Sequence, residues 1–306
     1  MSRVVIEGSY NLKNLRAYQM YIEYMTLKGI SEETLKSYRY DILQWFRYIN
    51  VYQNNKIYNE IEMEDVEDFL RFCKLHGNKE DRIKRRCASI SSFYIYLKRN
   101  KLVISSPTEF IDRPIKKMNA RKKIFLTEKQ VKDLKMNLDK FNNIVAECYI
   151  LFSINTACRR GAVQKLKWEN VDFEEREATT IEKGPKEVTL FFSEAVRDKL
   201  IELKKFYEEN NIKSEFVFLS KYHGKYKKCG KSALSGWVRK AGEMINVKGL
   251  TPHALRRSSA TIMKLSGMPL EDISKLLNHS GTEVTNKHYI QIDKRKLKED
   301  KDKFDI

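Results

Sequence analysis

The segment TPHALRRSSAT, residues 251–261, carries the strongest signal for fold and function in the chain. Thr251 and Pro252 predict the start of a helix, because proline is favoured at the first helical position, where its missing N–H is not needed. His253 and Arg256, three residues apart, then share one face of that helix. The helix N-terminus adds unpaired backbone N–H groups and a positive dipole end. The segment therefore predicts a histidine and an arginine presented to an anion.

Two further segments place polar residues where predicted helices end. The sequence NTACRRG, residues 155–161, follows an apolar stretch and puts Arg159 in a turn. The sequence LLNHS, residues 276–280, ends another predicted helix, and His288 and Tyr289 follow shortly after it. Three separated segments thus supply arginine, histidine and tyrosine to one predicted domain.

The remaining pattern predicts a mainly α fold with a small β element. Glycine and proline are scarce, at 12 and 5 residues, and apolar side chains recur at helical spacing. Residues 178–192 instead predict two short strands around the turn KGPK, which gives a small β-hairpin or sheet in the second domain. The N-terminal part predicts amphipathic helices over residues 14–28, from 32 after a Ser31 cap, from about 64, and over 81–99.

The length of 306 residues suggests about two domains. Pro107 and Pro114 interrupt helical periodicity, and a basic stretch without periodicity follows them. Thr127 and Gln130 then form a capping-box pattern that begins a new helix. We expect an N-terminal helical domain over 1–112, a basic linker over 113–123 and a second domain over 124–306.

The charge balance favours a polyanionic partner. Lys and Arg number 59 against 41 Asp and Glu, a formal net charge of +18. No apolar run is long enough for a membrane span, no secretory signal is evident, and the five cysteines form no CxxC pair. We therefore expect a cytoplasmic protein without disulfides, metal or membrane. The predicted DNA-binding residues are basic side chains of the fourth helix and the linker: Arg82, Arg85, Arg86, Lys122 and Lys123.

These motifs resemble those of the tyrosine recombinases, also called the phage integrase family. The second half is similar to the catalytic domain of that family in the order and spacing of its motifs, and the first half resembles its helical, SAM-like core-binding domain. The matched positions are Thr156 to Arg159, Lys183 in the hairpin turn, His253 to Arg256, Leu276 to His279, and Tyr289.

The resemblance implies a site-specific recombinase that works through a 3′-phosphotyrosyl intermediate and a Holliday junction. Its substrate would be double-stranded DNA with inverted-repeat core sites, and the enzyme would associate with the nucleoid. It would need no cofactor, and it would form a homotetramer on DNA through its C-terminal tail while remaining monomeric without DNA. The implied catalytic residues are Tyr289 as nucleophile, Arg159 and Arg256 as phosphate clamp, His253 as proton acceptor, Lys183 as acid and His279 as a hydrogen-bond donor.

The chain departs from the family pattern at three positions. Ala162 replaces the usual acid three residues after Arg159, so support for Arg159 must come from elsewhere. Arg257, a further predicted DNA contact, stands where a histidine is common, and Pro185 is unusual in the hairpin turn. Two alternatives remain open: a DNA-relaxing enzyme like the type IB topoisomerases, and a non-catalytic DNA-binding regulator with the same fold.

Overall fold

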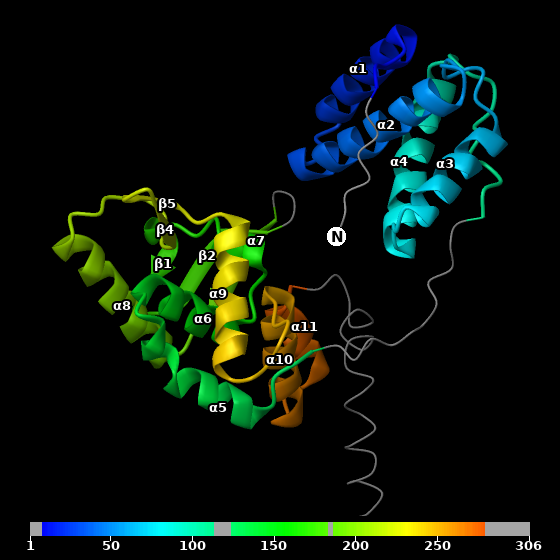
Figure 1. Ribbon diagram of the computed structural model, residues 1–306. Coiled ribbons are helices and arrows are strands. Elements are labelled where there is room, and N and C mark those ends of the chain that lie inside the picture. The colour runs from blue at the N-terminus through cyan, green and yellow to red at the C-terminus, as the bar shows by residue number, and fades with distance from the viewer. Residues whose placement is uncertain (1–7, 113–123, 183–185, 279–306) are drawn as a thin grey trace, which may run out of the picture. The chain divides into compact units, whose positions relative to one another are not determined.

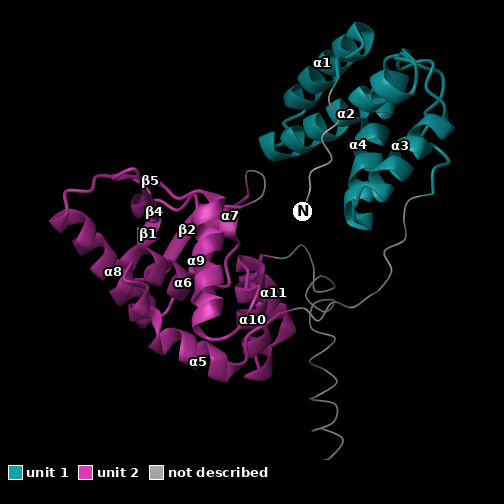
Figure 2. Ribbon diagram, viewed as in Figure 1, with its two compact units in different colours: residues 1–119 teal, residues 120–306 magenta. Residues whose placement is uncertain are grey.

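The structure is a computed structural model of the 306-residue chain, and it describes residues 8–112, 124–182 and 186–278. The chain divides into two compact units, unit 1 (residues 1–119) and unit 2 (residues 120–306) (Figure 2). Helices predominate in both units, and unit 2 adds small sheets, which confirms the mainly α, two-domain prediction. Within the described residues, no helix is long and apolar enough to cross a membrane.

Unit 1 is a helical unit around an aromatic core. Trp45 and Phe46 are buried beside Phe93, and the rings of Phe46 and Phe93 lie 5.7 Å apart in the edge-to-face arrangement that aromatic pairs favour. Ser31 precedes the second helix as predicted, but its hydroxyl makes no capping bond and instead contacts the Thr34 hydroxyl at 2.9 Å. The helices are α1 (Leu12–Leu27), α2 (Glu32–Tyr52), α3 (Met63–Leu75) and α4 (Glu80–Arg99).

Unit 2 combines helices with a three-stranded and a two-stranded antiparallel sheet (Figure 1). The helices are α5 (Glu128–Met136), α6 (Ile144–Thr156), α7 (Arg160–Val163), α8 (Glu194–Glu209), α9 (Lys231–Met244), α10 (Pro252–Leu265) and α11 (Leu270–Leu276), with 3₁₀ turns at Leu138–Phe141 and Trp168–Asn170. The strands are β1 (Val171–Asp172), β2 (Glu177–Ile181) and β3 (Glu187–Phe191) in that order, and β4 (Leu219–Tyr222) paired with β5 (Lys225–Lys228).

Helix α6 is the central element of unit 2. It is apolar on nearly all sides, as expected for a buried helix, and it packs against α8, α9 and α10. Small side chains let α10 approach α6 closely. At this contact the Ser259 hydroxyl donates to the Ile154 carbonyl of α6. The neighbouring Ser258 hydroxyl accepts the Leu126 N–H at 2.7 Å. Serines of the TPHALRRSSAT segment thus fasten α10 to the centre of the unit.

Several local predictions are confirmed. Thr127 and Gln130 form the expected capping box at the start of α5. Thr251 caps α10 with Pro252 in its first turn, and β2 and β3 form the predicted hairpin. Strand β1 and the β4–β5 hairpin were not predicted from the sequence. The two residues of β1 are too short to show a period, and β4–β5 is rich in lysine, which is depleted in strands.

Candidate active site

The turn after α6 supplies the first arginine of the site. Ala157 ends α6 in the left-handed conformation, with φ of 51°, and Arg159 precedes the short helix α7. A non-glycine residue rarely adopts this conformation, and here burial of the Ala157 side chain among α10 and α11 supports it. The turn fixes the direction of the Ala157 carbonyl and of the Arg159 side chain.

Arg256 reaches this turn from α10. Its side chain is 8% exposed, and its Nη1 donates to the Ala157 carbonyl at 3.0 Å. Its Nη2 donates to the Leu277 carbonyl, just after α11. Arg256 therefore joins three segments that are far apart in the sequence, and few of its N–H groups face solvent.

Glu182 brings the two arginines to one point. It follows β2, its side chain is 3% exposed, and its carboxylate forms an ion pair with Arg159. Its Oε1 lies 3.9 Å from Nη1 of Arg256. Arg159 also lies 3.4 Å from the Asn278 carbonyl through both terminal nitrogens. The structure thus assembles Arg159 and Arg256 around one buried carboxylate.

His253 lies in the first turn of α10, one helical turn before Arg256. Loss of solvation, and then the positive charges of Arg256, Arg257, Arg160 and Arg159, lower the pKa of His253 from its ordinary value of 6.5. The imidazole is therefore neutral near pH 7, the form that can accept a proton.

Five predicted site residues lie outside the described residues: Lys183, His279, Tyr289, Lys122 and Lys123. Two of them directly follow, in the sequence, residues that contact Arg159. Glu182 precedes Lys183 and Asn278 precedes His279, and both Glu182 and Asn278 contact Arg159.

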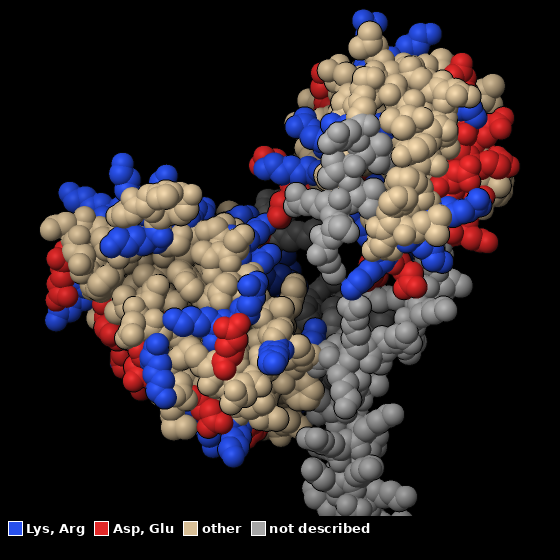
Figure 3. All heavy atoms as spheres, in the orientation of Figure 1, with Lys and Arg blue, Asp and Glu red and all other residues tan. Residues whose placement is uncertain are grey.

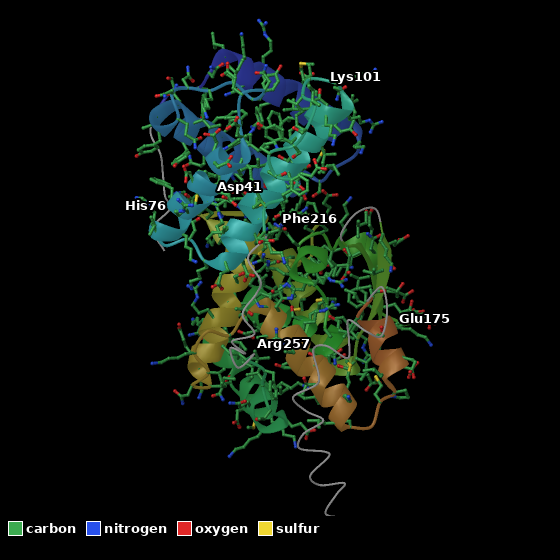
Figure 4. The ribbon with its side chains drawn as sticks, turned by 90° about the vertical axis from the view of Figure 1, so that its right-hand side faces the viewer. Asp41, His76, Lys101, Glu175, Phe216 and Arg257 are labelled. Atoms are coloured by element: carbon green, nitrogen blue, oxygen red, sulfur yellow. The ribbon has the colours of Figure 1, made fainter. Side chains whose placement is uncertain are left out.

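In unit 1, the predicted basic face of α4 surrounds an acid that the sequence analysis overlooked. Asp41 of α2 is fully buried and accepts two hydrogen bonds of 2.8 Å from Nε and Nη2 of Arg85 (Figure 4). Ser89 donates to Asp41 at 3.2 Å, and Arg82 lies 3.7 Å from it. Arg82 and Arg85 remain 36% and 39% exposed, so their outer edges are open to a phosphate.

Arg86 differs from its neighbours. It is 1% exposed, and its guanidinium lies over the rings of Phe69 and Tyr40. The prediction that Arg86 contacts DNA disagrees with this burial, because α4 turns that side chain toward α3 and α2. Arg257 is half-buried on α10 and donates to the Ile124 carbonyl at 3.0 Å (Figure 4).

A further basic surface was missed. On the face shown in Figure 3, Lys and Arg gather over the β4–β5 hairpin, whereas the Asp and Glu side chains of unit 2 lie along α8 and lower on the unit. The lysines Lys221, Lys225, Lys227 and Lys228 of that hairpin are exposed. The sequence shows this surface as a lysine-rich run, but the run has no helical periodicity and therefore predicts no helix.

Comparisons with protein-family models match both units. The model described as "Phage integrase family" matches residues 124–296, which is more than half of the chain. The model described as "Phage integrase, N-terminal SAM-like domain" matches residues 17–101.

Curated relatives and solved structures agree with these matches. The chain is 27% identical over 300 residues to "Tyrosine recombinase XerC" of Caldanaerobacter subterraneus subsp. tengcongensis, covering 90% of this chain and 82% of the relative. It is 25% identical over 288 residues to "Tyrosine recombinase XerD" of Oceanobacillus iheyensis, covering 89% and 92%.

Among solved structures, a lambda integrase dimer bound to a COC′ core site aligns with a TM-score of 0.68 at 13% identity, covering 90% of this chain and 94% of that one. The XerH site-specific recombinase bound to a difH substrate aligns with a TM-score of 0.67 at 15% identity, covering 90% and 81%. At these identities the structural alignments support the fold.

Proposed function

The chain belongs to the phage integrase family, and from this premise we propose that it is a site-specific tyrosine recombinase that cleaves and rejoins DNA strands. The observation that supports this most directly is the meeting of Arg159 and Arg256 at Glu182, beside His253. Related proteins are named tyrosine recombinases, and structures of the same fold hold DNA, so double-stranded DNA is the substrate. Acting on DNA, the enzyme would associate with the nucleoid.

Two arginines suit phosphodiester transfer because charge builds on the non-bridging oxygens in the transition state. A guanidinium can donate two parallel hydrogen bonds to such oxygens, which an ammonium group cannot do. Cations that are already in place stabilise that charge without reorganising during the reaction. Arg159 and Arg256 would form this clamp.

The reaction would proceed in two displacements. The phenolic oxygen of Tyr289 attacks the phosphorus and loses its proton to His253, which forms a 3′-phosphotyrosyl bond. The bond to the 5′-oxygen breaks, and Lys183 gives that oxygen a proton, while His279 donates a hydrogen bond to the phosphate. A 5′-hydroxyl of a second duplex then attacks the phosphotyrosine and releases Tyr289. Two such rounds pass through a Holliday junction at inverted-repeat core sites.

The DNA backbone would be held by basic residues of both units and the linker. Contacts of this kind position the duplex without reading its sequence, and they make affinity fall with salt. Arg86 is left out because it is buried. The proposed contacts are Arg82, Arg85, Lys122, Lys123 and Arg257.

We propose that a neighbouring protomer's tail completes the assembly. Residues Phe191, Met263, Met268 and Leu276 line a largely apolar cavity of about 820 Å³ beside α10 and α11. The 28 residues after Asn278 include the apolar residues Leu297, Phe304 and Ile306 in a highly charged stretch. Insertion of that tail into the cavity would link protomers into a tetramer on DNA and leave the free protein monomeric.

Phe304→Asp tests this assembly. The variant should bind one core half-site as wild type does, yet form no tetramer on a full site in sedimentation analysis. Tetramers of unchanged stability would contradict the tail proposal.

A covalent trapping experiment tests the activity itself. The wild-type protein is incubated with a nicked suicide duplex of its core site, from which the cleaved fragment diffuses away. We expect a covalent protein–DNA adduct with wild type and none with Tyr289→Phe. A wild-type protein that binds the duplex but never forms the adduct would contradict the proposed activity. It would favour the alternative of a non-catalytic DNA-binding regulator.

A further inference from the structure

Glu182 has a position that the proposed reaction leaves unexplained. It is a buried acid in a site that must bind an anionic phosphate, where a negative charge opposes substrate binding. Its Oε2 meets Arg159, and its Oε1, 3.9 Å from Arg256, makes no hydrogen bond with the described residues. A buried carboxylate persists only where its partners offset the cost of losing water, so its partners indicate its role.

Two hydrogen bonds position the backbone at Glu182 and just before it. Its N–H donates to the Lys186 carbonyl at 3.0 Å across the β2–β3 hairpin. Two residues earlier, the Thr180 hydroxyl donates to the Ala162 carbonyl of α7 at 2.9 Å. Side chains two apart along an extended chain point to the same side, so Thr180 and Glu182 both face α7. Both are buried there.

Ala162 on α7 is fully buried and offers no acid to Arg159. The carboxylate that contacts Arg159 instead enters from the end of β2. This answers the question raised by the sequence at Ala162: the support for Arg159 comes from a strand that lies beside α7, not from α7 itself.

We propose that Glu182 is a positioning residue for the cleavage step, which rests on the proposed recombinase activity. Its carboxylate lies between two guanidinium groups that would otherwise repel each other in a partly desolvated site. It holds them at a fixed separation and orientation with respect to the scissile phosphate. The carbonyls of Ala157, Leu277 and Asn278 also accept from these guanidinium groups and help to set their directions.

This role predicts that loss of the carboxylate slows cleavage without weakening DNA binding. Glu182→Gln keeps the shape but removes the charge, and its amide N–H₂ would face the arginines. We expect the single-turnover rate of adduct formation at saturating DNA to fall about 100-fold, as for a misplaced reacting group. Affinity for the core site should stay the same or become tighter, because a negative charge has left the phosphate site.

The matched control is Glu187→Gln. Glu187 is exposed at the start of β3, where it pairs with Ile181 of β2. The change therefore removes the same charge from the same hairpin. It should leave the rate and the affinity unchanged. A rescue variant adds Ala162→Glu to Glu182→Ala, which returns a carboxylate from α7, and we expect it to recover at least about tenfold of the lost rate.

Three results would overturn the proposal. The first is a Glu182→Gln protein that forms the adduct at the wild-type rate. The second is a Glu182→Gln protein whose slower cleavage is accompanied by weaker DNA binding and a lower melting temperature, since Glu182 would then have a structural role. The third is a Glu187→Gln variant as slow as Glu182→Gln. Failure of the wild-type protein to form any adduct would instead refute the proposed function.

Discussion

Each unit of the protein buries one carboxylate among arginines, and the two clusters differ in how completely the acid is paired. In unit 1, Asp41 accepts two hydrogen bonds of 2.8 Å from Arg85 and one from Ser89. In unit 2, Glu182 forms an ion pair with Arg159 through one oxygen, and its other oxygen lies 3.9 Å from Arg256 and makes no hydrogen bond within the part of the chain that the structure describes.

The arginines differ in the same sense. Arg85 directs its fork at one acid, the geometry that gives the strongest ion pair and that here joins α2 to α4. Arg256 and Arg159 divide their N–H groups between a carboxylate and main-chain carbonyls. The fully hydrogen-bonded Asp41–Arg85 ion pair stabilises the fold. The two arginines that share Glu182 are instead suited to bind a further anion. The comparison predicts stability effects at the first cluster and activity effects at the second.

The largest effect is expected from Arg256→Lys. Lysine keeps the charge but loses the planar fork, so it cannot hold Ala157 and Leu277 while donating to a phosphate. We expect adduct formation to fall about 10²- to 10³-fold, measured in single-turnover cleavage of the suicide duplex. Arg85→Lys is the matched change in unit 1 and should form the adduct at nearly the wild-type rate once bound. If adduct formation fell equally in the two variants, the two arginine clusters would not differ in their importance for the reaction.

Asp41→Asn should give the second largest effect, and it should be a loss of stability. The change leaves Arg85 without its counter-charge at a buried position. Breaking a buried pair costs about 3–5 kcal/mol, and the partial exposure of Arg85 brings the expected loss of unfolding free energy to about 2–3 kcal/mol. Urea denaturation measures it, and protein that is still folded should cleave normally. A stable but inactive variant would show that the first cluster serves the reaction.

A smaller effect is expected from Arg82→Gln. Arg82 is 3.7 Å from Asp41 and 36% exposed, so it contributes less to the pairing of Asp41 and more to the outer surface. If it contacts a phosphate, the slope of log affinity against log salt should decrease in magnitude by about 1, measured by anisotropy titrations at several salt concentrations. Arg86→Gln, buried beside it, provides the comparison and should leave the slope as it is. An unchanged slope in Arg82→Gln would make this arginine purely structural.

The smallest effect concerns pH. Because the pKa of His253 is lowered below 6.5, its neutral, proton-accepting form persists to lower pH, and the acidic limb of the cleavage rate should have its midpoint below pH 6.5. Arg257→Gln removes one of the charges that lower this pKa, so the limb should move to higher pH. A pH–rate profile of the two proteins measures the shift, and a limb that moves down instead would contradict the assigned cause.

Local sequence signals predicted the elements well, and they predicted the contacts between elements poorly. Caps at Thr127 and Thr251 are decided by neighbouring residues, and both formed as expected. The Asp41–Arg85 pair joins α2 to α4, and nothing local to either residue shows it. Arg86 resembles its neighbours on a helical projection, but α4 packs against α1, α2 and α3, and only part of its basic face stays exposed.

The candidate site shows the same limit. Motif order predicted Arg159, His253 and Arg256 as site residues, and the structure brings the two arginines together at Glu182. Glu182 matches no expected motif position, although it directly precedes the hairpin turn that holds Lys183. Its role depends on β2 lying beside α7, which is a tertiary fact that the missing acid at Ala162 hinted at but did not locate.

The anchoring of Arg256 has a consequence for the newly made protein. Its two main-chain acceptors, Ala157 and Leu277, lie before and after it in the chain, and Glu182 comes from a third segment. During synthesis Arg159 is made first, and its partners arrive one segment at a time. The arrangement of Arg256 and Arg159 around Glu182 therefore forms only after all of these segments have been made and have folded together.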